Sequence, residues 1–120
     1  MKENKLTIIN SQYDDIRILH IVGYLDAHTA NILEKEIENS IKNGFSKILC
    51  DCEELEYISS AGFGVFMEFI EELRSNGGDL KFTRLNSKLK NLFDLLGFNV
   101  LFEIENDIEK LKSDFAKKVQ

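Results

Sequence analysis

The alternation of strand-like and helix-like segments constrains the fold of this chain more than any other feature. Two apolar, β-branched segments come first, at residues 6–9 and 16–22, and Gly23 ends the second. Segments with helical spacing then alternate with strand-like runs, which gives the order β-β-α-β-α-β-α-β-α. Parallel strands need a crossover, usually a helix, so we expect a mixed, mostly parallel sheet of about five strands flanked by about four helices. This order predicts the α/β class.

The remaining elements are set out by their boundary residues. The predicted strands after Gly23 are residues 47–52, 80–85 and 100–104, with a polar loop directly after the first of them. The predicted helices begin at Thr29, in the serine-rich stretch 59–60, at Asn86 or Ser87, and at Asn106. In such sheets, sites form where the carboxyl end of a strand turns into a helix. The two turns that stand out are residues 23–29 and 53–64.

Composition narrows the classes of function. The chain has 120 residues, and 15 Lys and Arg stand against 21 Asp and Glu, for a net charge of -6. That balance argues against nucleic acid or an anionic membrane as a partner. No apolar run approaches the roughly 20 residues of a membrane span, and the polar start Met1–Lys5 lacks the apolar core of a signal peptide. We expect one cytoplasmic domain over residues 1–120, without membrane insertion.

Catalytic and metal-binding side chains are scarce. The chain has only two histidines. Its two cysteines are too few for a disulfide framework. Cys50 and Cys52 fall on one face of a predicted strand, but no further ligands accompany them, so we expect buried core thiols rather than a metal site. The sequence predicts no metal, no other cofactor and no enzymatic activity.

The segment from Ser59 to Gly64 places two hydroxyl groups at the start of a helix. One interpretation is plain N-capping, although Gly62 and Gly64 in the first turn are costly unless something approaches closely. A hydrolase nucleophile elbow would need glycine where Ile58 stands. A phosphate-binding P-loop would need a lysine that the segment lacks. The open alternatives are therefore a cap and a serine that carries a phosphate at the helix N-terminus.

Three motifs in order resemble a known family. Residues 23–30 read Gly-Tyr-Leu-Asp-Ala-His-Thr-Ala, and residues 59–64 read Ser-Ser-Ala-Gly-Phe-Gly. Residues 89–98 carry a Leu-Phe-x-x-x-Gly-hydrophobic pattern. Together they resemble the STAS-domain family of bacterial anti-sigma factor antagonists, from about Leu6 to Phe115. The resemblance implies the STAS fold.

The resemblance also implies a role for Ser60. This position matches the serine that the family's partner, both anti-sigma factor and ATP-dependent serine kinase, phosphorylates, and a phosphatase would reverse the reaction. Ser59 replaces the family's usual aspartate and is the less favoured acceptor, and Ala61 replaces the following hydroxyl residue. The resemblance implies that the unphosphorylated form binds the anti-sigma factor and so releases a sigma factor. The alternative is a constitutive STAS scaffold, or a ligand-sensing module of a transporter or a stress-signalling assembly.

The predicted partner-binding residues surround this serine turn. They are Asp26, Thr29, Ile32, Ser59, Ala61, Gly62, Phe63 and Gly64. Asp26 and Thr29 could equally form the N-cap of the first helix. Ile32 is expected to face solvent, because it lies opposite the apolar face of that helix. Asp26, Glu53, Glu54 and Glu56 are expected at the same end of the sheet, where an added phosphate would repel an acidic partner surface. A small enzyme that uses Asp26 and Ser60 is disfavoured, since no plausible base accompanies them.

Overall fold

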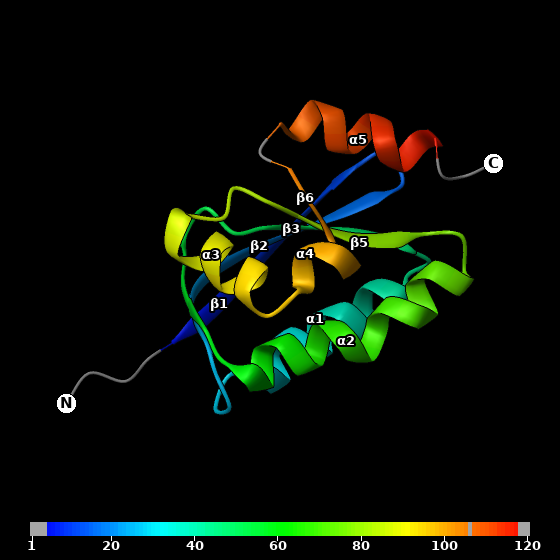
Figure 1. Ribbon diagram of the computed structural model, residues 1–120. Helices are drawn as coiled ribbons and strands as arrows, with labels where there is room; N and C mark the ends of the chain where they lie inside the picture. Colours follow the sequence, from blue (N-terminus) through cyan, green and yellow to red (C-terminus); the bar gives the residue numbers. More distant parts are fainter. Residues whose placement is uncertain (1–4, 106, 118–120) are drawn as a thin grey trace.

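The computed structural model describes residues 5–105 and 107–117, which contain six strands and five helices (Figure 1). The strands are β1 (Leu6–Tyr13), β2 (Ile16–Leu25), β3 (Lys47–Asp51), β4 (Leu55–Ile58), β5 (Asp79–Thr83) and β6 (Glu103–Ile104). The helices are α1 (Ala30–Lys42), α2 (Ser60–Ser75), α3 (Ser87–Leu95), α4 (Phe98–Leu101) and α5 (Ile108–Lys117). The α/β class and the alternation are confirmed.

The strands form one mixed sheet in the order β1-β2-β3-β5-β6. β1 is antiparallel to β2, and the other pairs are parallel. The long strand β2 pairs with β3 along Ile16–His20 and with β4 from Gly23 to Leu25, and the register of the second pair shifts between Gly23 and Tyr24. α1 and α2 cover one face of the sheet and α5 lies on the other (Figure 1). This layering places the N-termini of α1 and α2 at the same end of the sheet.

Two elements differ from the prediction. β4 occupies the predicted polar loop, where the buried residues Leu55 and Ile58 lie on either side of two exposed residues. Four residues are too few to show a strand period in the sequence. α4 takes the start of the strand predicted at residues 100–104, because Gly97 adopts a left-handed φ of 77° and the chain turns into a second short helix. β6 keeps only Glu103–Ile104.

The main core lies between the sheet and the pair α1 and α2. Its fully buried side chains include Leu19, Ile21, Leu33, Ile37, Phe66 and Phe82. A second cluster of Ile16, Leu49, Leu111 and Phe115 lies under α5. The thiols of Cys50 and Cys52 are free and buried in the main core, as predicted.

The last helix, α5, begins at Ile108 and is preceded by Asp107. Asn106, predicted to open it, lies outside the described residues. Asp107 Oδ1 accepts hydrogen bonds from the backbone N–H groups of Glu109, at 3.0 Å, and Lys110, at 3.2 Å. Within the described ranges, no helix is long and apolar enough to cross a membrane.

Candidate functional site

Two segments distant in the sequence meet where β2 and β4 end. Leu25 is opposite Ile58 in the parallel pair, and the Ser59 N–H donates a 2.9 Å hydrogen bond to the Leu25 carbonyl oxygen. On the same strand, the Gly23 N–H donates to the Glu54 carbonyl oxygen at 3.0 Å. The loop before α1 and the serine turn before α2 are therefore held together by backbone hydrogen bonds.

Hydrogen bonds of the Asp26 and Thr29 side chains hold the loop before α1 in a fixed conformation. Asp26 Oδ1 accepts from the N–H groups of His28, at 2.9 Å, and Thr29, at 3.2 Å. Thr29 Oγ1 accepts from the Asp26 N–H at 2.9 Å and donates to the Tyr24 carbonyl oxygen at 2.8 Å. Thr29 is the N-cap residue of α1 by position, but its side chain caps no helical N–H. Both side chains shape the loop beside the serine turn.

The two serines of the turn have different environments. Ser59 is the N-cap residue of α2 in an extended conformation, and its Oγ is buried without a hydrogen-bond partner in the described chain. Ser60 is the first residue of α2 and is exposed. Of the two hydroxyl-bearing residues, Ser60 is the one that the structure presents to solvent.

The small residues of the turn serve two purposes. Gly62 is buried, and a Cβ there would lie 2.6 Å from Leu25 Cγ, so its close approach is to this chain's own core. Gly64 is exposed, and a Cβ there would meet nothing within 4 Å. Phe63 is buried and stacks on Phe98 with ring centroids 4.4 Å apart. Gly62 and Phe63, predicted to contact a partner, thus support the turn from beneath, and Gly64 lies on its surface.

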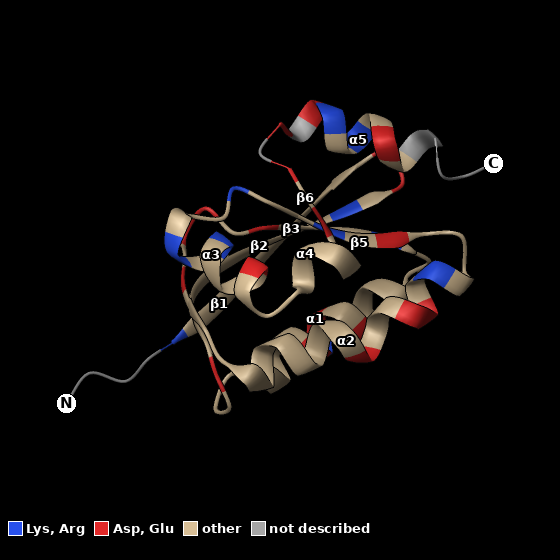
Figure 2. Cartoon of the chain, viewed as in Figure 1, with Lys and Arg blue, Asp and Glu red and all other residues tan. Residues whose placement is uncertain are grey.

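The first half of the helix that begins at Ser60 is uncharged. The first half of α2, from Ser60 to Met67, has no charged residue, and its charges begin at Glu68 (Figure 2). Ala61 is half-buried within this uncharged stretch. The start of α2 is therefore an uncharged surface.

Sequence reasoning missed a polar cluster next to this end of the sheet. The Asp51 carboxylate is buried and accepts hydrogen bonds from His20 Nδ1, at 2.8 Å, and from Arg84 Nε, at 3.0 Å. Burial opposes its ionisation, but the hydrogen bonds from Arg84 and His20 outweigh that effect and lower the pKa of Asp51. Arg84 also pairs with Glu53 at 3.1 Å. One of the four acidic residues expected here, Glu53, is therefore paired with a cation that it shares with Asp51.

Some signal for this cluster was present in the sequence. Asp51 interrupts the apolar run between Cys50 and Cys52, and it faces the side of the sheet opposite to those core thiols. Nothing marks Arg84, which turns toward Asp51 because it has a left-handed φ of 59° after β5. Among the described residues, no group of three or more His, Cys, Asp or Glu side chains could hold a metal ion.

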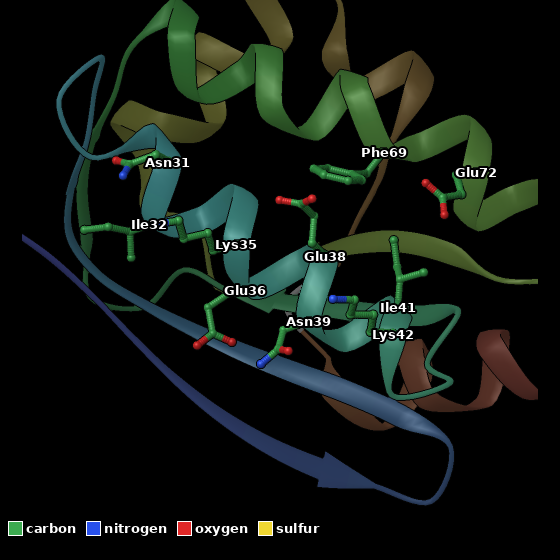
Figure 3. Close-up of a pocket in the computed structure, with 10 residues that line it drawn as sticks. All are labelled: Asn31, Ile32, Lys35, Glu36, Glu38, Asn39, Ile41, Lys42, Phe69 and Glu72. Carbon is green, nitrogen blue, oxygen red and sulfur yellow. The ribbon is translucent and has the colours of Figure 1, made fainter.

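Ile32 lies in the first turn of α1 and lines a hollow along that helix. It is 37% exposed, as the helical spacing predicted. The hollow has a volume of about 700 Å³, and its walls include Ile32, Lys35, Glu36 and Phe69 (Figure 3). Charges of both signs line it, which gives no preference for one kind of ligand.

The family assignment follows from comparison with known proteins. Residues 7–111 match the STAS domain, so the chain belongs to the STAS-domain family. The anti-sigma-B factor antagonist of Listeria monocytogenes is 30% identical over 89 residues, covering 73% of this chain and 77% of that protein. The anti-sigma-B factor antagonist of Bacillus subtilis is 27% identical over 96 residues, covering 80% and 86%.

Solved structures agree on the fold. The anti-sigma factor antagonist SpoIIAA in its unphosphorylated form superimposes with a TM-score of 0.75 at 17% identity, covering 89% of this chain and 95% of that one. The Bacillus cell fate determinant SpoIIAA in the phosphorylated form gives a TM-score of 0.63 at 18% identity, covering 92% and 98%. The six-stranded sheet with its helices is the STAS fold of these antagonists.

Proposed function

We propose that this chain is an anti-sigma factor antagonist whose docking surface is switched by phosphorylation of Ser60. The unmodified form binds an anti-sigma factor that is also a serine kinase, and a sigma factor is released. The same partner phosphorylates Ser60 with ATP, and a phosphatase restores the binding form. The observation that carries the proposal is the exposed Ser60 at the first position of α2, beside the loop that Asp26 and Thr29 lock.

The contrast between the two serines supports Ser60 as the acceptor. A kinase must reach the hydroxyl oxygen, and the Ser59 Oγ is buried whereas Ser60 is exposed. A phosphate on Ser60 would lie at the N-terminus of a helix of 16 residues, where free N–H groups and the helix dipole favour negative charge. Phosphorylation at this position is therefore compatible with the folded helix.

Shape and charge support the switch. The neutral first half of α2, with exposed Gly64, lets a partner surface approach closely. A phosphate adds about -1.5 to -2 charges at neutral pH. Glu54 and Glu56 are exposed on the segment that leads to this turn, so the added charge meets an acidic background. A partner surface that fits the neutral turn would lose its contacts.

We expect a cytoplasmic binding protein that has no catalytic activity of its own. ATP is a substrate of the partner rather than of this chain. The experiment on modification uses the anti-sigma factor kinase from the same genome, ATP and mass spectrometry of the whole chain. We expect one phosphate on Ser60 in the wild type and none on Ser60→Ala. Phosphate on another residue, or a phosphorylated Ser60→Ala, would refute the assignment.

Partner binding is tested with a matched helix-start serine. Ser87 is the exposed first residue of α3, so Ser87→Asp adds the same charge at another helix N-terminus. In pull-downs with the purified kinase, we expect wild type, Ser60→Ala and Ser87→Asp to bind, and Ser60→Asp to lose binding. Equal binding by all four proteins would favour the alternative function, a constitutive scaffold. That alternative has some support because Ser59 stands where the family usually has an aspartate.

A further inference from the structure

The outer edge of β1 lacks the features by which sheet edges resist pairing. β1 pairs in the described chain with β2 alone, and its register runs without interruption from Leu6 to Tyr13. These eight residues contain no charged residue and no proline. Natural edge strands are protected by charges, prolines, bulges or shortness, because an open edge invites another strand. β1 has none of these protections.

The backbone groups that face outward can be assigned. The Lys5 carbonyl oxygen accepts a 2.9 Å hydrogen bond from the Tyr24 N–H, so odd-numbered residues of β1 bond to β2. In an antiparallel pair, the residues between them point their N–H and C=O groups the other way. The outward groups therefore belong to Leu6, Ile8, Asn10 and Gln12.

The side chains of β1 add an apolar contact at the middle of this edge. Ile9 is 57% exposed and lies on the sheet face that carries α5. That helix covers the far end of the strand, where Lys112 Nζ lies 3.6 Å from the Tyr13 ring centroid. Ile9 remains open to solvent at the centre of the strand.

We propose that two copies of this chain pair antiparallel through their β1 edges, with Ile9 at the two-fold axis. Opposite residues in antiparallel strands share a face, so Ile9 meets Ile9 of the partner subunit and Thr7 meets Ser11 of the partner subunit. This register also brings the outward groups of Ile8 and Asn10 of the partner subunit together as a hydrogen-bonded pair. The proposal goes beyond the proposed function and does not depend on Ser60.

Charge at the strand ends supports antiparallel self-pairing. Lys5 precedes β1, Asp14 follows it, and both are exposed. The antiparallel arrangement places each Lys5 near Asp14 of the partner subunit, whereas a parallel arrangement would place like charges together. Because the interface is isologous, pairing consumes both β1 edges and ends at a dimer.

Cysteine cross-linking tests the register. The native thiols are buried, so Ile9→Cys adds the one reactive thiol expected in the folded protein. Facing cysteines in a non-hydrogen-bonded pair have Cα atoms about 4.5 Å apart, within disulfide range. With oxidised glutathione we expect Ile9→Cys to form a covalent dimer. Ser11→Cys alone should not form one, because the new cysteines of the two subunits lie about 13 Å apart in this register. A mixture of Thr7→Cys and Ser11→Cys should form the mixed dimer.

Sedimentation equilibrium tests the pairing itself, with circular dichroism as a check on folding. We expect the wild type to dimerise with concentration, and Ile9→Lys to weaken the dimer about tenfold or more, because two like charges would face each other. Val100→Lys is the control, since Val100 is 83% exposed on α4 and the charge change is the same. A wild type that stays monomeric up to about 1 mM would overturn the proposal. So would equal effects of the two lysine variants, or cross-linking of Ile9→Cys no faster than that of Ser11→Cys.

Discussion

Gly62 and Leu25 are packed so closely that the glycine leaves no room for a side chain. A Cβ on Gly62 would lie 2.6 Å from Leu25 Cγ and 2.9 Å from Leu25 Cδ2. Leu25 is fully buried, and its carbonyl oxygen accepts the Ser59 N–H. Gly62 thus sets the distance between α2 and β2. Through Leu25 it also sets the position of the serine turn.

Gly62→Ala should destabilise the protein. The added methyl group must displace Leu25 or lift the first turn of α2, and overpacking of a dense core costs about 1–3 kcal/mol. Urea unfolding should show that loss in the free energy of unfolding. The displaced turn should also weaken binding to the anti-sigma factor kinase.

Gly64→Ala is the matched control two residues along the same helix. A Cβ there meets nothing within 4 Å, and alanine has the higher helix propensity. We expect the free energy of unfolding to rise by about 0.5–1 kcal/mol. Equal losses from the two substitutions would contradict the assignment of Gly62 to the core contact.

The Asp51–Arg84 pair should make stability depend on pH in the acid range. The pKa of Asp51 is lowered from its ordinary value of 3.8, because the hydrogen bonds of Arg84 and His20 outweigh its burial. A carboxyl group with a lowered pKa in the folded state contributes its full stability above the unfolded value and loses it as the pH falls through the folded value. Arg84→Leu should therefore cost about 1–3 kcal/mol at pH 7, and the difference should shrink below about pH 4.

Lys90→Leu is the control for that measurement, since Lys90 is an exposed cation on α3. Its effect on unfolding should be within about 0.5 kcal/mol and show no comparable change in acid. If Arg84→Leu and the wild type lose stability in parallel down to the lowest pH, the pair contributes nothing through Asp51.

Local patterns were enough to predict much of this fold. Helical spacing identified α1, whose inward Leu33 and Ile37 are fully buried. The sequence predicts Asn86 or Ser87 as the cap of the helix after β5, and Asn86 Oδ1 accepts a hydrogen bond from the Leu89 N–H at 2.8 Å. Such features are visible because each depends on residues that are neighbours in the sequence.

Features that depend on contacts between distant segments were missed. β4 is too short to show a period, and its identity comes from pairing with the end of β2. The reach of Arg84 to Asp51 depends on a left-handed residue after β5. The burial of Gly62 depends on Leu25, which is 37 positions earlier, so the motif alone could not separate a packing glycine from one that admits a partner.

The buried thiols should be inert in the folded protein. Burial is the main reason that the pKa of Cys50 is raised far above its ordinary value, and the Asp51 carboxylate adds to it. The pKa of Cys52 is raised by burial and by its neighbours. Because the thiolate is the reactive form, Ellman's reagent should label neither thiol in buffer and both in denaturant. Rapid labelling under native conditions would contradict their burial.

The protein should lose less stability when Lys81 is replaced by an apolar residue than when its partner Glu103 is replaced. Its side chain is fully buried, with Nζ 2.9 Å from Glu103 Oε1 and 5.0 Å from the Phe115 ring centroid. Removing one member of a buried pair leaves an uncompensated charge, whereas an apolar replacement of similar volume is often neutral. Because Glu103 is partly exposed, we expect Glu103→Leu to cost about 1–3 kcal/mol, and Lys81→Met to stay within about 1 kcal/mol of the wild type. The double variant should recover most of the Glu103→Leu loss in urea unfolding, and an additive loss would show that the pair is not coupled.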